Sequence, residues 1–431
     1  MIQLKEMRDH QVNASTQMIQ YLHEGKLEQA LNEFSKIKAG GTDDEKFELA
    51  EELFQLGFHE HAKELFQLLI QSYPDEGELK VLLAETLVEL DDTEEAILQL
   101  DDISKGDEFY PRSLLLAADL YQMQGLYEVS ERKLLLANRT LPGEPIIHFA
   151  LAELYNEQGK FLEAIRHYKE ITKAGLEEVA GVQINQRLGE CYSAGGAFEE
   201  SLPYYEKALE NNREINTLFG YGFTAFQSAH YQTAIEIFSE LVEADPEYHS
   251  AYTLLAKAYE HEERLDDAMD AAENGLKADP FNKELYLFAG KLALKQGNEG
   301  KSENYLRESI AIDPNYLEAG LLLNRLLIKQ ERAEDVIELI QHIENAGESD
   351  PQFRWDAAKA YEWMEEFDKA SNEYTQAYVV YNDHIDFLED YGAFLLEESR
   401  VKEAHTIYAK LVKKDPTNAD WLERLERLEQ M

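Results

Sequence analysis

The sequence has little of several features on which common folds and activities depend. Cys191 is the single cysteine among 431 residues, which excludes an internal disulfide framework and a cysteine-based zinc site. The 41 Lys and Arg residues are fewer than half of the 86 Asp and Glu residues, so the net charge is −45. A chain with this charge repels nucleic-acid phosphates and anionic lipid surfaces, so direct binding to either is not expected.

Long apolar runs are also missing. The longest candidates, residues 114–120 and 320–328, are far shorter than the roughly 20 residues that a membrane-spanning helix needs. The first ten residues, MIQLKEMRDH, lack the apolar run of a signal peptide. We therefore expect a cytoplasmic protein without membrane insertion.

What the sequence does have is a regular period. Asp245, Asp279 and Asp313 each precede a proline and stand 34 residues apart, and two amphipathic helical patterns joined by a polar turn lie between them. We call the residue at the start of each second helical pattern, which is small in all units but one, the pivot residue. Eight of the eleven intervals between pivot residues are 34. The twelve pivot residues are Ala30, Ala62, Ala96, Ser130, Ala164, Ser201, Ala234, Ala268, Ser302, Val336, Ala370 and Ala404.

Three fixed offsets confirm the register. The residue twelve before the pivot is Gly or Ala in ten of twelve repeats, as at Gly222, and the residue four after it is bulky in eleven, as at Phe238. A mid-helix Gly costs about 1 kcal/mol against Ala, so a close approach of two helix backbones is the expected reason. Six repeats have Gly five before the pivot, where a left-handed helix end is expected: Gly25, Gly57, Gly125, Gly159, Gly196 and Gly297.

Spacing, small residues and turn glycines together resemble the tetratricopeptide repeat family over about residues 11–418. Composition and layout are also similar to the YpiA-type tetratricopeptide repeat proteins of Gram-positive bacteria. The resemblance implies an all-α fold: a right-handed superhelical solenoid of about twelve antiparallel helix pairs, with the first helix of each pair lining a concave face.

The interruptions of the period suggest a division of the chain. Residues 171–183 lengthen the junction between the fifth and sixth repeats by three residues and carry Gly175 and Gly181. A bend at this junction and a plain longer loop are both open. The expected organisation is an N-terminal extension (1–10), an N-terminal block of about five repeats (11–181), a C-terminal block of about seven (182–418) and a capping helix (419–431).

A series of cations is the strongest functional signal. The resemblance implies that the residue eleven before each pivot faces the concave groove, and repeats eight to eleven place a cation there, after Phe223 in repeat seven. Apolar and basic residues one helical turn away add to this surface. The predicted groove for an acidic, partly apolar segment of a partner consists of Lys257, Lys291, Arg325 and Lys359, which we call the basic series, with Lys295, Lys329, Trp355, Trp363, Phe219 and Phe223.

The alternative is that these cations only pair with acids of the protein itself. Lys257 can reach Glu260 on its own helix, and Lys359 has acids in reach as well, but Lys291 and Arg325 have no acid three or four residues away. We therefore favour a ligand groove. Attraction between the two halves of the chain stays a further alternative, because repeats two to six place acids at the same offset. This acidic series, a second surface for a basic partner, is Glu51, Glu85, Asp119, Glu153 and Glu190.

The predicted function is a non-enzymatic scaffold or adaptor for one or more cytoplasmic proteins, with a homodimer possible. No nucleophile–base pair stands out, and the G-x-G-x-x-A match at 220–225 has no preceding strand, so no catalytic residue, cofactor or metal is expected. One alternative is a receptor for a small ligand or signalling peptide at Phe219, Phe223 and Phe226. Another is an acidic assembly factor that docks on a basic surface of a nucleic-acid-handling machine.

Overall fold

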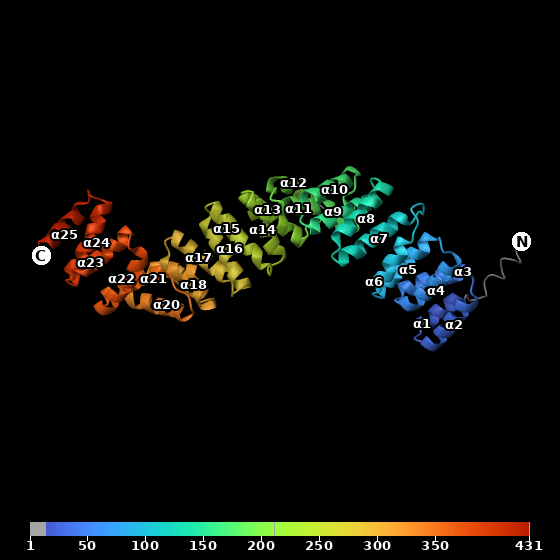
Figure 1. The fold of residues 1–431 in the computed structure, drawn as a ribbon, viewed down its shortest axis with the longest axis horizontal. Coiled ribbons are helices and arrows are strands. Elements are labelled where there is room, and N and C mark those ends of the chain that lie inside the picture. The colour runs from blue at the N-terminus through green and yellow to red at the C-terminus, as the bar shows by residue number, and fades with distance from the viewer. Residues whose placement is uncertain (1–13, 211, 431) are drawn as a thin grey trace. The chain divides into compact units, whose positions relative to one another are not determined.

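The computed structural model describes residues 14–210 and 212–430. These residues form 25 helices and one hairpin of two short strands (Figure 1). The predicted all-α repeat fold is therefore confirmed. The predicted N-terminal extension lies outside the described residues.

The chain divides into two compact units, the first ending at Asn212 and the second beginning at Arg213. In both units each odd-numbered helix up to α23 packs against the even-numbered helix that follows it, which makes twelve pairs. The elements of the first unit are α1 Ala14–His23, α2 Leu27–Gly40, α3 Asp43–Gln55, α4 His59–Ser72, α5 Gly77–Glu89, α6 Thr93–Asp101, α7 Tyr110–Met123, α8 Tyr127–Thr140, α9 Pro145–Glu157, α10 Phe161–Lys173, β1 Glu178–Val179, β2 Val182–Gln183, α11 Ile184–Ala194 and α12 Phe198–Ala208.

The second unit holds the remaining six pairs and a last helix. Its elements are α13 Ile215–Gln227, α14 Tyr231–Ala244, α15 His249–His261, α16 Leu265–Ala278, α17 Lys283–Lys295, α18 Glu299–Ile312, α19 Leu317–Lys329, α20 Ala333–Asn345, α21 Pro351–Trp363, α22 Phe367–Tyr381, α23 Ile385–Glu397, α24 Val401–Lys414 and α25 Ala419–Glu429.

The long fifth junction folds into a small hairpin. Strands β1 and β2 pair antiparallel, with Glu178 opposite Gln183 and Val179 opposite Val182. This hairpin lies inside the first unit, and the two units divide one helix pair after the expected block boundary at 181/182. A hinge at the hairpin stays a prediction.

The pivot residues lie at the centre of the packing, since all twelve have no solvent exposure. The residues twelve positions earlier are buried as well, and the four glycines among them face the bulky residue of their own pair. A Cβ added at Gly222 would lie 2.7 Å from the ring of Phe238, and one added at Gly189 would lie 3.0 Å from the ring of Tyr205. The bulky residue that fills each pair thus leaves no room for a side chain on the facing helix.

The turn inside each pair has one conformation throughout. The residue five before the pivot has a positive φ in all twelve repeats, including six where it is not glycine. A left-handed conformation is unfavourable for a residue with a Cβ, so the packing of the two helices imposes this turn. The six non-glycine residues are Asp91, Ala229, Glu263, Glu331, Glu365 and Ser399.

Helix α25 ends the stack by packing against α24. Its side chains Trp421 and Leu428 are buried, each with 6% exposure. The Nε1–H of Trp421 donates to Glu389 of α23 at 2.6 Å, and the Asn418 side chain caps the helix start. The apolar face of this helix is thereby used to cover the last pair.

Candidate protein-interaction site

The residues of the predicted groove lie on the first helices of five successive pairs in the second unit, α13, α15, α17, α19 and α21. Among these, α13 contacts α15 and α19 contacts α21 directly. Equivalent positions on neighbouring first helices therefore follow each other along one side of the unit.

Four of the six predicted cations form ion pairs, each with an acid of a neighbouring repeat. Lys291 Nζ lies 2.5 Å from Glu318 Oε1 on the next first helix. The lack of an acid three or four residues from Lys291 therefore did not indicate an unpaired cation, because its acidic partner lies in the next repeat. The other pairs are Lys295 with Glu260, Lys329 with Glu299 at 2.6 Å, and Lys359 with Asp390 at 2.9 Å.

Lys257 and Arg325 differ from these four. Neither has an ion-pair partner within 4.0 Å in the part of the chain that the structure describes. Lys257 is half-buried, whereas Arg325 is exposed. Glu260, which the sequence offered as the partner of Lys257, binds Lys295 instead. The basic series thus has two unpaired members.

A small cavity lies beside Arg325. Its volume is about 310 Å³, and it opens between α17, the turn that follows, and α19. Leucines make its apolar wall, and Lys329 and Glu299 meet at its edge. The lining residues are Leu294, Gly297, Glu299, Leu322, Arg325, Leu326 and Lys329. The arrangement joins an unpaired guanidinium to an aliphatic surface.

The two predicted groove tryptophans have different surroundings. Trp355 packs on Phe387 with ring centroids 5.4 Å apart, and its Nε1–H donates to Asp390 at 3.0 Å. Asp390 therefore binds both Trp355 and Lys359. Trp363 is 39% exposed at the end of α21. Of the two, Trp363 offers the more accessible aromatic surface.

The three phenylalanines of repeat seven pack on two different sets of rings. Phe219 packs between Phe223 and Tyr248, with ring centroids 6.4 and 5.1 Å away. Phe226 packs on a different set of rings, Tyr231 at 5.6 Å and His261 at 5.8 Å. The rings are used to join repeat seven to repeat eight.

A buried polar pair beneath the basic series was missed by the sequence analysis. The Asn324 Nδ2–H donates to Asp356 Oδ2 at 2.5 Å, while the buried Asn324 Oδ1 has no partner. Burial raises the pKa of Asp356 to about 6, although Gln352, Lys359, Asn324 and Arg325 favour its charged form. The signal was available, because Asn324 occupies an offset that holds Gly or Ala in ten of twelve repeats.

The acidic series lies on first helices of the first unit and is partly neutralised. Arg112 pairs with Glu85 at 2.6 Å. Arg187 bridges Glu153 at 3.1 Å and Glu190 at 2.9 Å. Within the described residues, Glu51 and Asp119 have no hydrogen-bond or ion-pair partner.

The described residues also bear on whether the protein has a reactive thiol, a metal site or a membrane-spanning helix. Burial raises the pKa of the Cys191 thiol to about 12, so the thiolate needed for reactivity is strongly disfavoured. No group of three or more His, Cys, Asp or Glu side chains in residues 14–210 and 212–430 is arranged to hold a metal ion. Across the same residues, every helix is too short or too polar to cross a membrane.

Stacked antiparallel pairs with small residues at the helix crossings and a left-handed turn define a tetratricopeptide repeat protein. The chain belongs to the YpiA-like family of these proteins. It is 41% identical over 411 residues to the TPR repeat-containing protein YpiA of Bacillus subtilis (strain 168), covering 95% of this chain and 97% of that protein. The YpiA-like repeat family matches residues 122–176, and the family of YpiA-like C-terminal repeats matches residues 351–418.

General tetratricopeptide repeat families match residues 182–215, 225–292 and 283–316. Among solved structures, the chain is similar to MamA, with 20% identity and a TM-score of 0.38 over 40% of this chain and 94% of that one. It is also similar to YrrB, described as a TPR protein with an unusual peptide-binding site. That match has 19% identity and a TM-score of 0.38 over 43% of this chain and 95% of that one.

Proposed function

We propose that this protein is a non-enzymatic interaction scaffold of the cytoplasm and that its second unit binds an acidic, partly apolar segment of a partner protein. The single observation that carries the proposal is Arg325, an exposed guanidinium without an ion pair among the described residues, beside a leucine-walled cavity of about 310 Å³. A carboxylate of the partner would pair with Arg325, and an adjacent aliphatic side chain would cover the leucines.

The ion pairs of the neighbouring lysines refine this proposal. Pairs between exposed side chains contribute only about 0–1 kcal/mol, so Lys291 and Lys329 can exchange their own acids for those of a partner at little cost. Arg325 needs no such exchange. It is therefore the cation whose loss has the largest expected effect on binding.

The test is a charge reversal at Arg325 in the full chain. The probe is a fluorescein-labelled peptide with Asp-Leu-Glu-Leu in a Gly-Ser host, and binding is measured by fluorescence anisotropy at about 0.15 M salt, where exposed charges are screened beyond about 8 Å. We expect Arg325→Glu to weaken binding roughly 10- to 100-fold. A charge-assisted hydrogen bond contributes about 1.5–3 kcal/mol, and 1.4 kcal/mol is tenfold in affinity.

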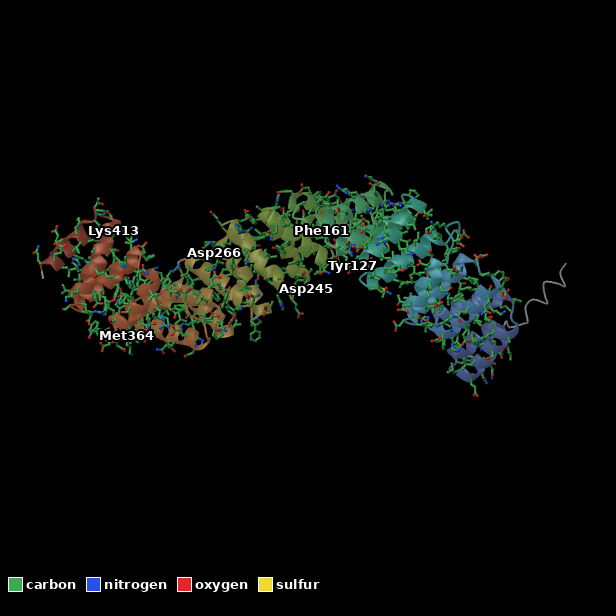
Figure 2. The ribbon with its side chains drawn as sticks, in the orientation of Figure 1. Tyr127, Phe161, Asp245, Asp266, Met364 and Lys413 are labelled. Carbon is green, nitrogen blue, oxygen red and sulfur yellow. The ribbon has the colours of Figure 1, made fainter. Side chains whose placement is uncertain are left out.

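Lys413→Glu is the matched control, because it changes the net charge equally. Lys413 is exposed on α24, where Figure 2 labels it, and has no ion pair among the described residues. We expect this variant to bind the peptide as the wild type does, and both variants to keep the helical circular dichroism spectrum of the wild type. Equal binding by the wild type and Arg325→Glu, or no binding by the wild type, contradicts the proposed groove. A peptide with Asn-Leu-Gln-Leu, which removes only the charges, should bind at least tenfold more weakly.

A further inference from the structure

The first unit has a cavity of about 520 Å³ between two successive first helices, α7 and α9, and the turn of the β1–β2 hairpin. Two of its apolar side chains face solvent, since Met123 is 77% and Ile146 is 39% exposed. Exposed apolar side chains that line a hollow are typical of binding surfaces. The apolar lining residues are Leu115, Met123, Ile146, Phe149, Ala150 and Ala180.

Three carboxylates share the lining with these residues, namely Asp119, Glu153 and Glu157. Glu153 is compensated by Arg187. Among the residues that the structure describes, Glu157 accepts hydrogen bonds only from neutral groups, the amide of Gln122 and the hydroxyl of Tyr127. Asp119 has no hydrogen-bond or ion-pair partner within the described residues, so the cavity presents two carboxylates that no cation of residues 14–210 and 212–430 neutralises.

The desolvation of the Asp119 carboxylate agrees with its position in the cavity. The side chain is exposed to solvent, yet the protein around it desolvates the carboxylate and raises its pKa. A carboxylate on a flat, open surface is not desolvated in this way. A cation placed beside Asp119 would regain the electrostatic stabilisation that water supplies elsewhere.

We propose that this cavity is a docking site for a partner segment in which a Lys or Arg residue is flanked by aliphatic residues. The basic side chain would lie between Asp119 and Glu157, and the aliphatic neighbours would cover Met123 and Ile146. Charge complementarity argues for such a partner and against a second copy of this chain, whose net charge of −45 would bring acids to an acidic rim. This site lies in the other unit and goes beyond the proposed function of the second unit.

The test uses the methyl signal of Met123 as a local probe. The chain has seven methionines, so a full-length sample with 13C-labelled methionine methyl groups gives few NMR signals, and Met123→Leu assigns the relevant one. The titrants are three capped peptides in a Gly-Ser host, with Leu-Lys-Leu, Leu-Gln-Leu or Ser-Lys-Ser at the centre. We expect the Met123 signal to shift in a saturable way with Leu-Lys-Leu and at least tenfold more weakly with the other two.

A double variant separates this site from general attraction to an acidic protein. Asp119→Asn with Glu157→Gln should weaken Leu-Lys-Leu binding at least tenfold. The control, Glu94→Gln with Glu128→Gln, removes the same charge from exposed positions on second helices α6 and α8 of the same unit and should leave binding unchanged.

Three results would overturn the proposal. One is an equal loss of binding in the two double variants, which would show unspecific charge attraction. The second is equal binding of Leu-Lys-Leu and Ser-Lys-Ser, which would show that the apolar wall takes no part. The third is a dimer in analytical ultracentrifugation that Asp119→Asn with Glu157→Gln dissociates, which would make a second copy the occupant.

Discussion

Replacing Gly222 by valine is expected to destabilise the second unit by about 3 kcal/mol, at the upper end for overpacked cores. Gly222 lies inside α13, and a Cβ there would be 2.7 Å from the ring of Phe238, which is fully buried. Because the protein encloses the Phe238 ring, moving the ring away would disturb its other packing contacts. The cost of the valine side chain therefore exceeds the gain in helix propensity, which is less than the roughly 1 kcal/mol that alanine brings in place of a mid-helix glycine.

The midpoint of unfolding by denaturant, followed by tryptophan fluorescence, measures this effect. All three tryptophans, Trp355, Trp363 and Trp421, lie in the second unit and report on it alone. Gly300→Ala is the control: its Cβ would meet nothing within 4 Å, so this variant should be as stable as the wild type or slightly more stable. Wild-type stability of Gly222→Val would show that the helix contact does not require glycine.

A double-mutant cycle tests whether the steric clash is between the side chain at position 222 and the ring of Phe238. Gly222→Ala should be destabilised in the presence of Phe238, because even one methyl group meets the ring. Combined with Phe238→Leu, the same alanine should cost at least 1 kcal/mol less, since contacting residues couple by about 0.5–3 kcal/mol. Additive effects of the two substitutions would argue against a direct contact.

The second large expected effect is a stabilisation. Asp356→Asn should make the second unit more stable by about 3 kcal/mol at pH 7 and leave its stability unchanged below about pH 4. Asp356 is only 7% exposed, and burial raises its pKa from 3.8 to about 6, which corresponds to about 3 kcal/mol because each tenfold change in proton affinity is worth about 1.4 kcal/mol. The amide variant removes the buried charge while it keeps the shape of the side chain.

Proton linkage determines how the stability difference between the variant and the wild type changes with pH. Since the folded state raises the pKa of Asp356, its stabilising contribution is fully present below the unfolded pKa of 3.8 and is lost as the pH rises through about 6. The difference in the free energy of unfolding between Asp356→Asn and the wild type should therefore grow between about pH 4 and pH 7. Denaturation at several pH values measures it. Asp270→Asn, at an exposed position on α16, should show no such gap. A difference that stays constant at all pH values would mean that folding does not shift the pKa of Asp356.

The repeat architecture could be predicted from the sequence because it depends on short-range regularities. Pivot residues such as Ala268 recur at a nearly constant spacing, and all twelve are fully buried in the structure. The left-handed turn was predicted only where glycine marks it. Residues such as Ala229 and Glu263 adopt the same conformation without any local sequence signal, since the helix packing on either side imposes it.

The candidate site was less predictable because its ion pairs join different repeats. The acid that binds Lys291 is Glu318, 27 residues later, and the acid that binds Lys359 is Asp390, 31 residues later. Searching one helix for partners at three or four positions misses both pairs. A search at offsets of 27 and 31 residues would have found both pairs, but it would also have offered Glu284 to Lys257 and Asp356 to Arg325, which form no such ion pairs in the part of the chain that the structure describes.

Cavities were not predictable at all. The leucine-walled cavity beside Arg325 and the carboxylate-lined cavity beside Met123 both depend on how far successive first helices lie apart. Side-chain identity alone does not determine that spacing. The sequence indicated the sign of the charge in each unit, and the structure adds the apolar surface next to it.

We propose that Arg325 and its cavity make this chain a scaffold for acidic, partly apolar segments. An unbiased peptide selection tests this most directly. A displayed library of random 12-residue peptides is selected in parallel on the full wild-type chain, Arg325→Glu and Lys413→Glu, and the enriched sequences are read. We expect peptides with Asp or Glu next to aliphatic residues to be enriched on the wild type and on Lys413→Glu and to be absent from Arg325→Glu. Enrichment of the same peptides on all three proteins, or none above an empty support, would contradict the claim.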